Sequence, residues 1–98
     1  VLVVDLPPGT GDVPLSLAQS IVVDGAIVVT TPQRLATVEA GKAIEMFRKL
    51  DVPVLGVVEN MSHARCECGR RSYPFGRGGG EALSQATGCA LLARVPVQ

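Results

Sequence analysis

The sequence predicts an α/β domain, organised as a three-layer fold with a parallel sheet and helices on both faces. Short continuous apolar runs, typical of strands buried on both faces, alternate with stretches of helical periodicity. The core is expected to be aliphatic, since the 98 residues include two Phe, one Tyr and no Trp. The resulting order of strands, helices and one long loop favours parallel strands joined by right-handed crossovers.

The N-terminal stretch predicts a strand, a loop and a helix. Val1–Leu6 is an apolar run, expected to be a buried strand that carries Asp5 to the edge of the sheet. The prolines and glycines that follow cannot continue it, because proline lacks the N–H donor and glycine favours turns. Asp12 is expected to cap a helix with Pro14 at its second or third position, and Asp24-Gly25 ends that helix.

Three further strands and two helices complete the pattern. The predicted strands are Ala26–Val29, Val54–Val58 and Leu91–Val95. Residues 34–50 predict a long helix and residues 81–86 a short one that ends at Thr87-Gly88. The apolar face of the long helix is expected to consist of Leu35, Val38, Ala43, Met46, Phe47 and Leu50.

Residues 61–80 are expected to form a long polar loop. A connection of this length without periodicity is a candidate for function. It contains Cys66 and Cys68, and the glycine run 76–80 is expected to make it mobile. The third cysteine, Cys89, precedes two leucines and is expected to be a small buried residue.

Composition excludes some classes of function. Nine basic and nine acidic residues give a net charge of zero, so bulk charge offers no argument for binding nucleic acid or an anionic membrane. No apolar run has membrane-spanning length, and three cysteines without a secretory signal favour a reducing compartment, the cytoplasm. The chain starts within a predicted strand and without Met, so we expect it to be part of a longer chain.

Ligands of parallel sheets bind beyond the carboxyl ends of the strands. Those ends are expected to be Asp5, Thr30-Thr31, Asn60 and Val95-Pro96. An acid at such an end can hold Mg²⁺ beside a phosphate, and Gly9 would let its backbone N–H approach that phosphate closely. On this pattern alone, Asp5 could equally be a loop-capping aspartate and Asn60 a turn-forming residue.

The sequence DLPPGTGD at residues 5–12 closely resembles the segment after the Walker B strand in the Mrp/NBP35 family. These are P-loop ATPases of the MinD and nitrogenase-iron-protein class that carry iron–sulfur clusters. The stretches VVTTPQ at 28–33, VLGVVENMS at 54–62 and FGRGGGE at 75–81 resemble further segments of the same family, in the same order. The resemblance implies the C-terminal part of one P-loop ATPase domain, with a Walker B and switch segment at 1–12 and a cysteine loop at 61–80.

The resemblance also implies roles for single residues. Asp5 would hold Mg²⁺ through water, and Gly9 would face the terminal phosphate. Asn60 would hydrogen-bond the adenine, and Pro96 would pack beside that base. The motif G-x-x-x-x-G-K-S/T is absent from the 98 residues, so the phosphate-binding loop is expected to precede Val1. This chain alone is therefore not expected to bind ATP well or to hydrolyse it.

Cys66 and Cys68 are candidate ligands of a metal centre. Two thiolates cannot complete the four-cysteine shell of a 4Fe–4S cluster, but a second copy of the chain could supply the other two. The resemblance implies such a cluster, bridging a homodimer, although the family spacing is C-x-x-C and this chain has C-x-C. In an extended segment, side chains two apart face the same side. Structural Zn²⁺ and redox-active thiols are alternatives, and His63 is a possible further ligand.

The function that these patterns favour is the binding of an iron–sulfur cluster and its transfer to recipient apoproteins, coupled to ATP binding and hydrolysis. A MinD- or ParA-like positioning ATPase without a cluster is a second hypothesis, which leaves the cysteine pair without a role. A third is a half-domain without catalytic activity that binds a metal or a partner.

Overall fold

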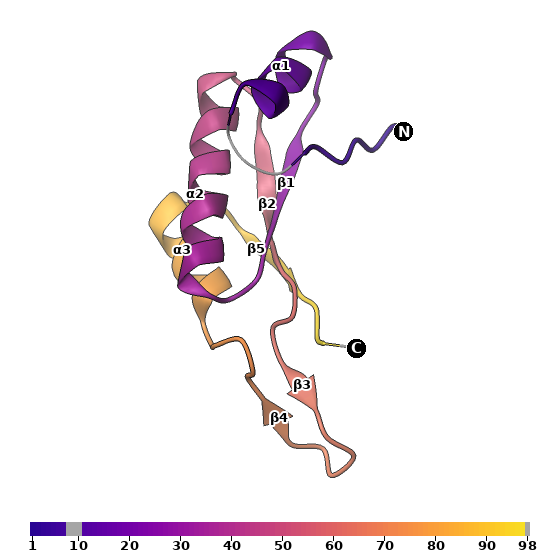
Figure 1. The fold of residues 1–98 in the computed structure, drawn as a ribbon, viewed down its shortest axis with the longest axis vertical. Coiled ribbons are helices and arrows are strands. Elements are labelled where there is room, and N and C mark those ends of the chain that lie inside the picture. The colour runs from indigo at the N-terminus through magenta and orange to yellow at the C-terminus, as the bar shows by residue number, and fades with distance from the viewer. Residues whose placement is uncertain (8–10, 98) are drawn as a thin grey trace.

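A parallel sheet with two helices against one face forms the centre of the computed structural model, which describes residues 1–7 and 11–97 (Figure 1). The strand order is β1-β2-β5, and a separate hairpin, β3-β4, projects from one end. The elements are α1 Asp12–Ser20, β1 Ala26–Thr30, α2 Arg34–Lys49, β2 Val54–Glu59, β3 Ala64–Arg65, β4 Arg71–Ser72, α3 Gly79–Thr87 and β5 Leu91–Arg94. The predicted α/β class, with a parallel sheet and flanking helices, is confirmed.

The two faces of the sheet differ in burial. Val28 of β1 pairs with Val57 of β2, and both point into the core beneath α2 and α3. Because successive side chains of a strand alternate between faces, Ile27 and Val29 point the other way, and they are 54% and 61% exposed. The second helical layer predicted from the sequence is not formed by residues 1–7 and 11–97.

The core lies between the sheet and α2. Ile44 is fully buried, and Ala40 and Phe47 lie on the same helix face because they are spaced by four and three residues. The predicted apolar face is wrong at two positions, since Leu35 is 79% exposed and Val38 is 46% exposed. The first buried residue of α2 is Ala40, so the buried face of this helix begins in its second turn. The prediction that Cys89 is buried is confirmed.

The N-terminal segment differs most from its prediction. Val1–Leu6 forms no strand, and residues 1–5 are exposed. Only Leu6 packs against the core cluster. An apolar run becomes a buried strand only where it pairs with another strand and elements cover both of its faces, and Val1–Leu6 pairs with none of the described strands. Asp12 is also not the predicted cap, because Gly11 occupies the N-cap position of α1 and Asp12 begins the helix.

The loop predicted at residues 61–80 contains structure of its own. β3 and β4 pair as a two-stranded antiparallel hairpin, with Ala64 opposite Ser72. The last two residues of the loop begin α3, which starts earlier than the predicted residue 81 and ends as predicted at Thr87. In the described parts of the chain, no helix combines the length and the apolarity needed to cross a membrane.

Two glycines of the run 76–80, Gly79 and Gly80, allow α3 to pack closely against neighbouring segments. A Cβ at Gly80 would collide with the carboxylate of Glu59, which is 1% exposed. Without that Cβ, the backbone N–H of Gly80 donates to Oε2 of Glu59 at 3.1 Å. The buried end of β2 is thereby tied to the first turn of α3, where a negative charge is favourable.

Candidate functional site

The carboxyl ends of β2 and β5 form a pocket of about 350 Å³. Asn60 and Pro96, which are 36 positions apart in the sequence, both line it. The chain after β5 continues to pair with the chain after β2, because the N–H of Ser62 donates to the carbonyl of Val95 at 2.9 Å. Parallel pairing therefore brings the two residues predicted for the adenine side of a nucleotide site into one pocket.

Asn60 is half-buried and stands at a turn. Its side-chain oxygen Oδ1 accepts the backbone N–H of Met61 at 2.9 Å, and Met61 has a positive φ of 53°. The turn-forming role of Asn60 is thus present in the structure. The amide Nδ2 carries two further donors, so the same side chain can hold the turn and still offer hydrogen bonds to a ligand.

The structure does not bring Asp5 to this pocket. The N-terminal segment lies in the half of the molecule away from the hairpin, whereas the C-terminus lies near the hairpin (Figure 1). Asp5 is exposed and does not end a strand, because the strand that should carry it has not formed. Gly9, predicted to face the terminal phosphate, lies outside the described residues.

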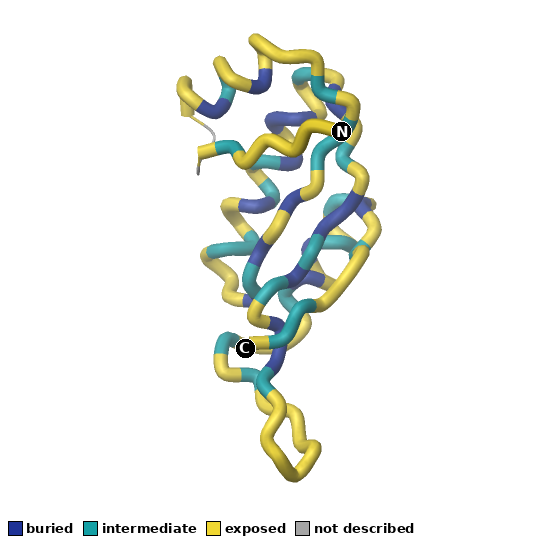
Figure 2. The backbone as a smooth tube through the Cα atoms, turned by 90° about the vertical axis from the view of Figure 1, so that its right-hand side faces the viewer, coloured by how far each residue is buried: buried dark blue, intermediate teal, exposed yellow. Residues whose placement is uncertain are grey.

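Cys66 and Cys68 lie in the turn of the hairpin, at its exposed end (Figure 2). The turn closes because the N–H of Gly69 donates to the carbonyl of Cys66 at 3.0 Å, and Gly69 adopts a left-handed φ of 85°. The two cysteines therefore lie in a tight turn and not in an extended segment. Both sulfurs nevertheless face the same side, because the turn brings the two Cα atoms to 5.3 Å.

The two sulfurs are joined in a disulfide. A metal or cluster binds cysteine as thiolate, so this pair must be reduced by two electrons before either sulfur can be a ligand. Residues 1–7 and 11–97 contain no group of three or more His, Cys, Asp or Glu side chains that could hold a metal ion. Within one copy of the chain, the hairpin can thus supply half of a four-cysteine shell.

His63, a possible further ligand, lies elsewhere. It is 6% exposed and lines a pocket at the base of the hairpin, while both cysteines are exposed at the turn. The sequence also gave no indication that Met61 and Val97 line the Asn60 pocket. The only sequence feature that could have indicated them is their position, because Met61 follows Asn60 and Val97 follows Pro96.

The profile of the ParA family, described as the NUBPL iron-transfer P-loop NTPase, matches residues 1–98. The chain belongs to this family. The resemblance inferred from the motifs at 5–12, 28–33, 54–62 and 75–81 is therefore confirmed.

Curated relatives in this family are described as iron–sulfur cluster carrier proteins. One from Pseudomonas fragi is 54% identical over 97 residues, which are 98% of this chain and 34% of the relative. One from Escherichia coli K12 is also 54% identical, over 26% of its length, and one from Pyrococcus horikoshii is 48% identical, over 33%. The chain thus spans between 26% and 34% of these relatives.

A solved structure supports the same fold. It is a nucleotide-binding protein from Archaeoglobus fulgidus in complex with ADP, with a TM-score of 0.82 and 40% sequence identity. The match covers 95% of this chain and 39% of that chain. The sheet and helices described above therefore correspond to part of a P-loop NTPase.

Proposed function

We propose that this chain is the C-terminal part of one P-loop ATPase domain that binds an iron–sulfur cluster and transfers it to recipient apoproteins. The observation that carries the proposal is the hairpin turn with its two adjacent cysteine sulfurs, exposed and directly downstream of the Asn60 pocket. The relatives described as cluster carriers support it.

The nucleotide part of the proposal uses residues from both ends of the chain. Asn60 would donate its amide hydrogens to the adenine, and Pro96 would pack against the base. Asp5 would hold Mg²⁺ through water, and Gly9 would approach the terminal phosphate with its N–H. The exposed position of Asp5 leaves its carboxylate accessible, but the site needs a phosphate-binding loop that these 98 residues do not contain. Turnover of ATP is accordingly proposed for the longer polypeptide and not for this chain alone.

The cluster part of the proposal uses two copies of the chain. Cys66 and Cys68, once reduced, would supply two thiolates, and the same pair of a second copy would supply the other two ligands of a 4Fe–4S cluster. Because the pair is exposed at the end of a projecting hairpin, a second copy can approach it without unfolding the sheet. The cluster would be the cargo that the homodimer delivers.

The experiment that tests this function is anaerobic reconstitution of the natural polypeptide with iron and sulfide after reduction. We expect a visible charge-transfer band that is lost in Cys66→Ala/Cys68→Ala. The band should be kept in Cys89→Ala, because Cys89 is buried and lies between α3 and β5, outside the hairpin. The double variant should still bind ADP with unchanged affinity, since Asn60 and Pro96 are intact.

One outcome would contradict the proposal, and a second would require a further variant. A band that survives the double substitution would remove both cysteines from the ligand set. A double variant that loses ADP binding together with the band would indicate general misfolding, and reconstitution of Cys66→Ser/Cys68→Ser, which keeps the side-chain size, would then decide between the two causes.

A further inference from the structure

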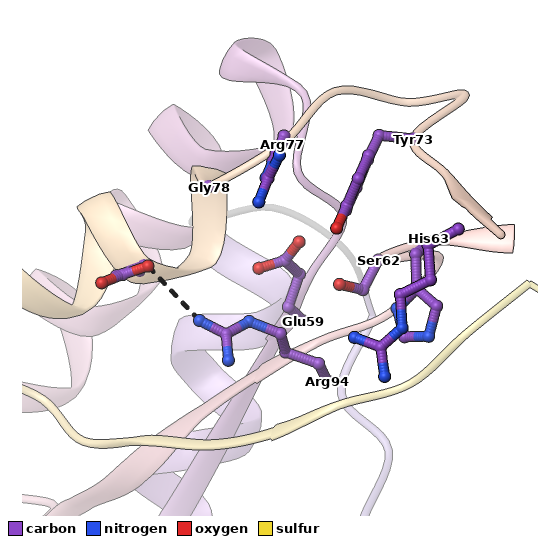
Figure 3. A pocket seen from close by; sticks show the side chains of 9 residues that line it. Glu59, Ser62, His63, Tyr73, Arg77, Gly78 and Arg94 are labelled. Atoms are coloured by element: carbon purple, nitrogen blue, oxygen red, sulfur yellow. Dashed lines mark hydrogen bonds and ion pairs between the residues drawn. The ribbon is translucent and has the colours of Figure 1, made fainter.

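A second pocket, of about 230 Å³, lies between the end of β2, the hairpin and the start of α3 (Figure 3). Its lining is polar and charged, and includes Glu59, His63, Arg71, Tyr73, Arg77 and Arg94. None of these side chains has a role in the proposed function. Arg71 of β4, Arg77 of the loop before α3 and Arg94 of β5 all line it, although the chain as a whole has no net charge.

The charges in this pocket are only partly compensated. Arg94 pairs with Glu81 at 3.4 Å, and Glu59 accepts a backbone N–H at the start of α3 at 3.1 Å. Arg71 and Arg77 make no ion pair with any other side chain of the described residues. With three guanidinium groups against two carboxylates, the pocket keeps a positive charge.

His63 adds an unsatisfied hydrogen-bonding group. The side chain is 6% exposed, and its Nε2 is buried without a hydrogen-bond partner among the described residues. A buried polar atom of this kind costs free energy unless a partner satisfies it. Burial is the main cause that lowers the pKa of His63 below its ordinary value of 6.5, and the charge of Arg71 is the second. The imidazole is therefore neutral at neutral pH.

Tyr73 holds one of the unpaired arginines in place. The guanidinium of Arg77 lies 4.7 Å from the centre of the Tyr73 ring, a cation–π contact. Figure 3 shows Arg77, Tyr73 and Arg94 arranged around Glu59, with Ser62 and His63 on one side. A guanidinium that is oriented in advance loses less freedom when it binds a planar or tetrahedral oxyanion.

We propose that this pocket binds a small oxyanion, either inorganic phosphate or a carboxylate group, held by Arg71 and Arg77 and hydrogen-bonded by His63. A metal cation is disfavoured by the same three guanidinium groups. The proposal goes beyond the function proposed above and does not rest on it, since it uses neither the cysteine pair nor Asn60. Because Arg71 belongs to β4, an occupied pocket would tie the hairpin to the start of α3.

The test follows the ring nitrogens of His63 by NMR in the isotope-labelled natural polypeptide, with assignment by the signal lost in His63→Gln. Potassium phosphate and sodium succinate are added separately, and potassium chloride serves as the control at equal ionic strength. We expect a saturable shift of the Nε2 signal with phosphate, with succinate or with both, and none with chloride. The anion that binds more tightly shows whether the pocket prefers phosphate or a carboxylate group.

The variant Arg71→Gln/Arg77→Gln should weaken the oxyanion by about tenfold or more, because it removes two charged hydrogen-bond donors. Arg70→Gln is the matched control, since Arg70 is the exposed neighbour of Arg71 and does not line the pocket. Its affinity should stay within about twofold of the unchanged protein. The absence of a saturable His63 shift with either anion, or equal affinity in the double variant, would overturn the proposal. Neither result would bear on the cluster band or on ADP binding.

Discussion

Glu59 illustrates how one buried side chain constrains a distant residue. Its carboxylate is 1% exposed, and it reaches the backbone of Gly80 at the start of α3. A buried carboxylate needs hydrogen-bond partners, and the backbone N–H at the start of α3 supplies one. The absence of a side chain at Gly80 is therefore part of the packing of β2 against α3.

Gly80→Ala is expected to destabilise the fold by about 1–3 kcal/mol, because the added methyl group collides with the Glu59 carboxylate in a packed region. Gly41→Ala is the matched control within α2. A Cβ there would meet only Leu83 at 3.7 Å, so the substitution should stabilise the helix by about 0.5–1 kcal/mol. Urea unfolding measures both changes. Equal effects of the two substitutions would contradict the role assigned to the Glu59 contact.

His63 predicts a pH dependence of stability. Burial is the main cause of its lowered pKa, the charges of Arg71, Arg65 and Arg94 act in the same direction, and Glu59 acts against them. Since the unfolded chain then binds a proton more readily than the folded one, this contribution to stability is complete above about pH 6.5 and is lost as the pH falls toward the lowered value.

The unfolding midpoint in urea should accordingly decrease between about pH 7.5 and pH 5.5, and His63→Gln should decrease less over the same interval. The carboxylates titrate mostly below this interval, so the difference between the two proteins reports on His63. Parallel pH profiles for the protein and the variant would exclude this assignment.

At the scale of elements, α2 shows that periodicity identifies a helix more reliably than it identifies the buried face. Residues 34–50 were predicted as the helix, and Arg34–Lys49 form it. The face that contacts the sheet, however, contains Ala40 and Ile44, whereas Leu35 is exposed. A helix face is buried only where a neighbouring element covers it, and β1, β2 and α3 cover α2 from its second turn onward.

Ile44→Ala should destabilise the fold by about 2–5 kcal/mol, since Ile44 is fully buried and its loss leaves a cavity between α2 and the sheet. Leu35→Ala removes a similar apolar side chain from the same helix, yet it should change the stability by no more than about 0.5 kcal/mol, because Leu35 is exposed. Thermal unfolding followed by circular dichroism provides the comparison. A large loss in Leu35→Ala would show that the first turn of α2 is covered in solution.

At the scale of the whole molecule, one face of the sheet is open. Ile27, Val29 and Leu55 are each more than half exposed, and Leu92 is nearly so. Buried and exposed positions alternate most clearly along β1. An exposed apolar face that extends over several strands is a candidate surface for contact with further protein.

The 98-residue chain prepared alone should therefore bind an apolar fluorescent dye, and Ile27→Thr/Val29→Thr should reduce the emission because it replaces the open apolar face with hydroxyl groups. Emission that is equal for the chain and for the double variant would show that the dye binds elsewhere.

Sequence patterns were sufficient to predict the elements whose signal is local. Two apolar runs and a helical period located β1, α2 and β2 nearly to the residue, and the motif at 54–62 placed Asn60 at the end of a strand. The family could be predicted for the same reason, because each of its motifs is a continuous stretch of chain. Burial of Cys89 beside two leucines also followed from neighbouring residues.

Features that depend on contacts between residues distant in the sequence could be seen only in the folded molecule. Val1–Leu6 is apolar enough for a strand, but it pairs with none of the described strands. The cysteine pair meets through a turn closed by Gly69, and the pocket of arginines around Glu59 and His63 joins side chains from three elements. The surfaces that meet in the fold decide which strands pair, which helix face is buried and which charges lie together. Local periodicity carries no information about which surfaces meet.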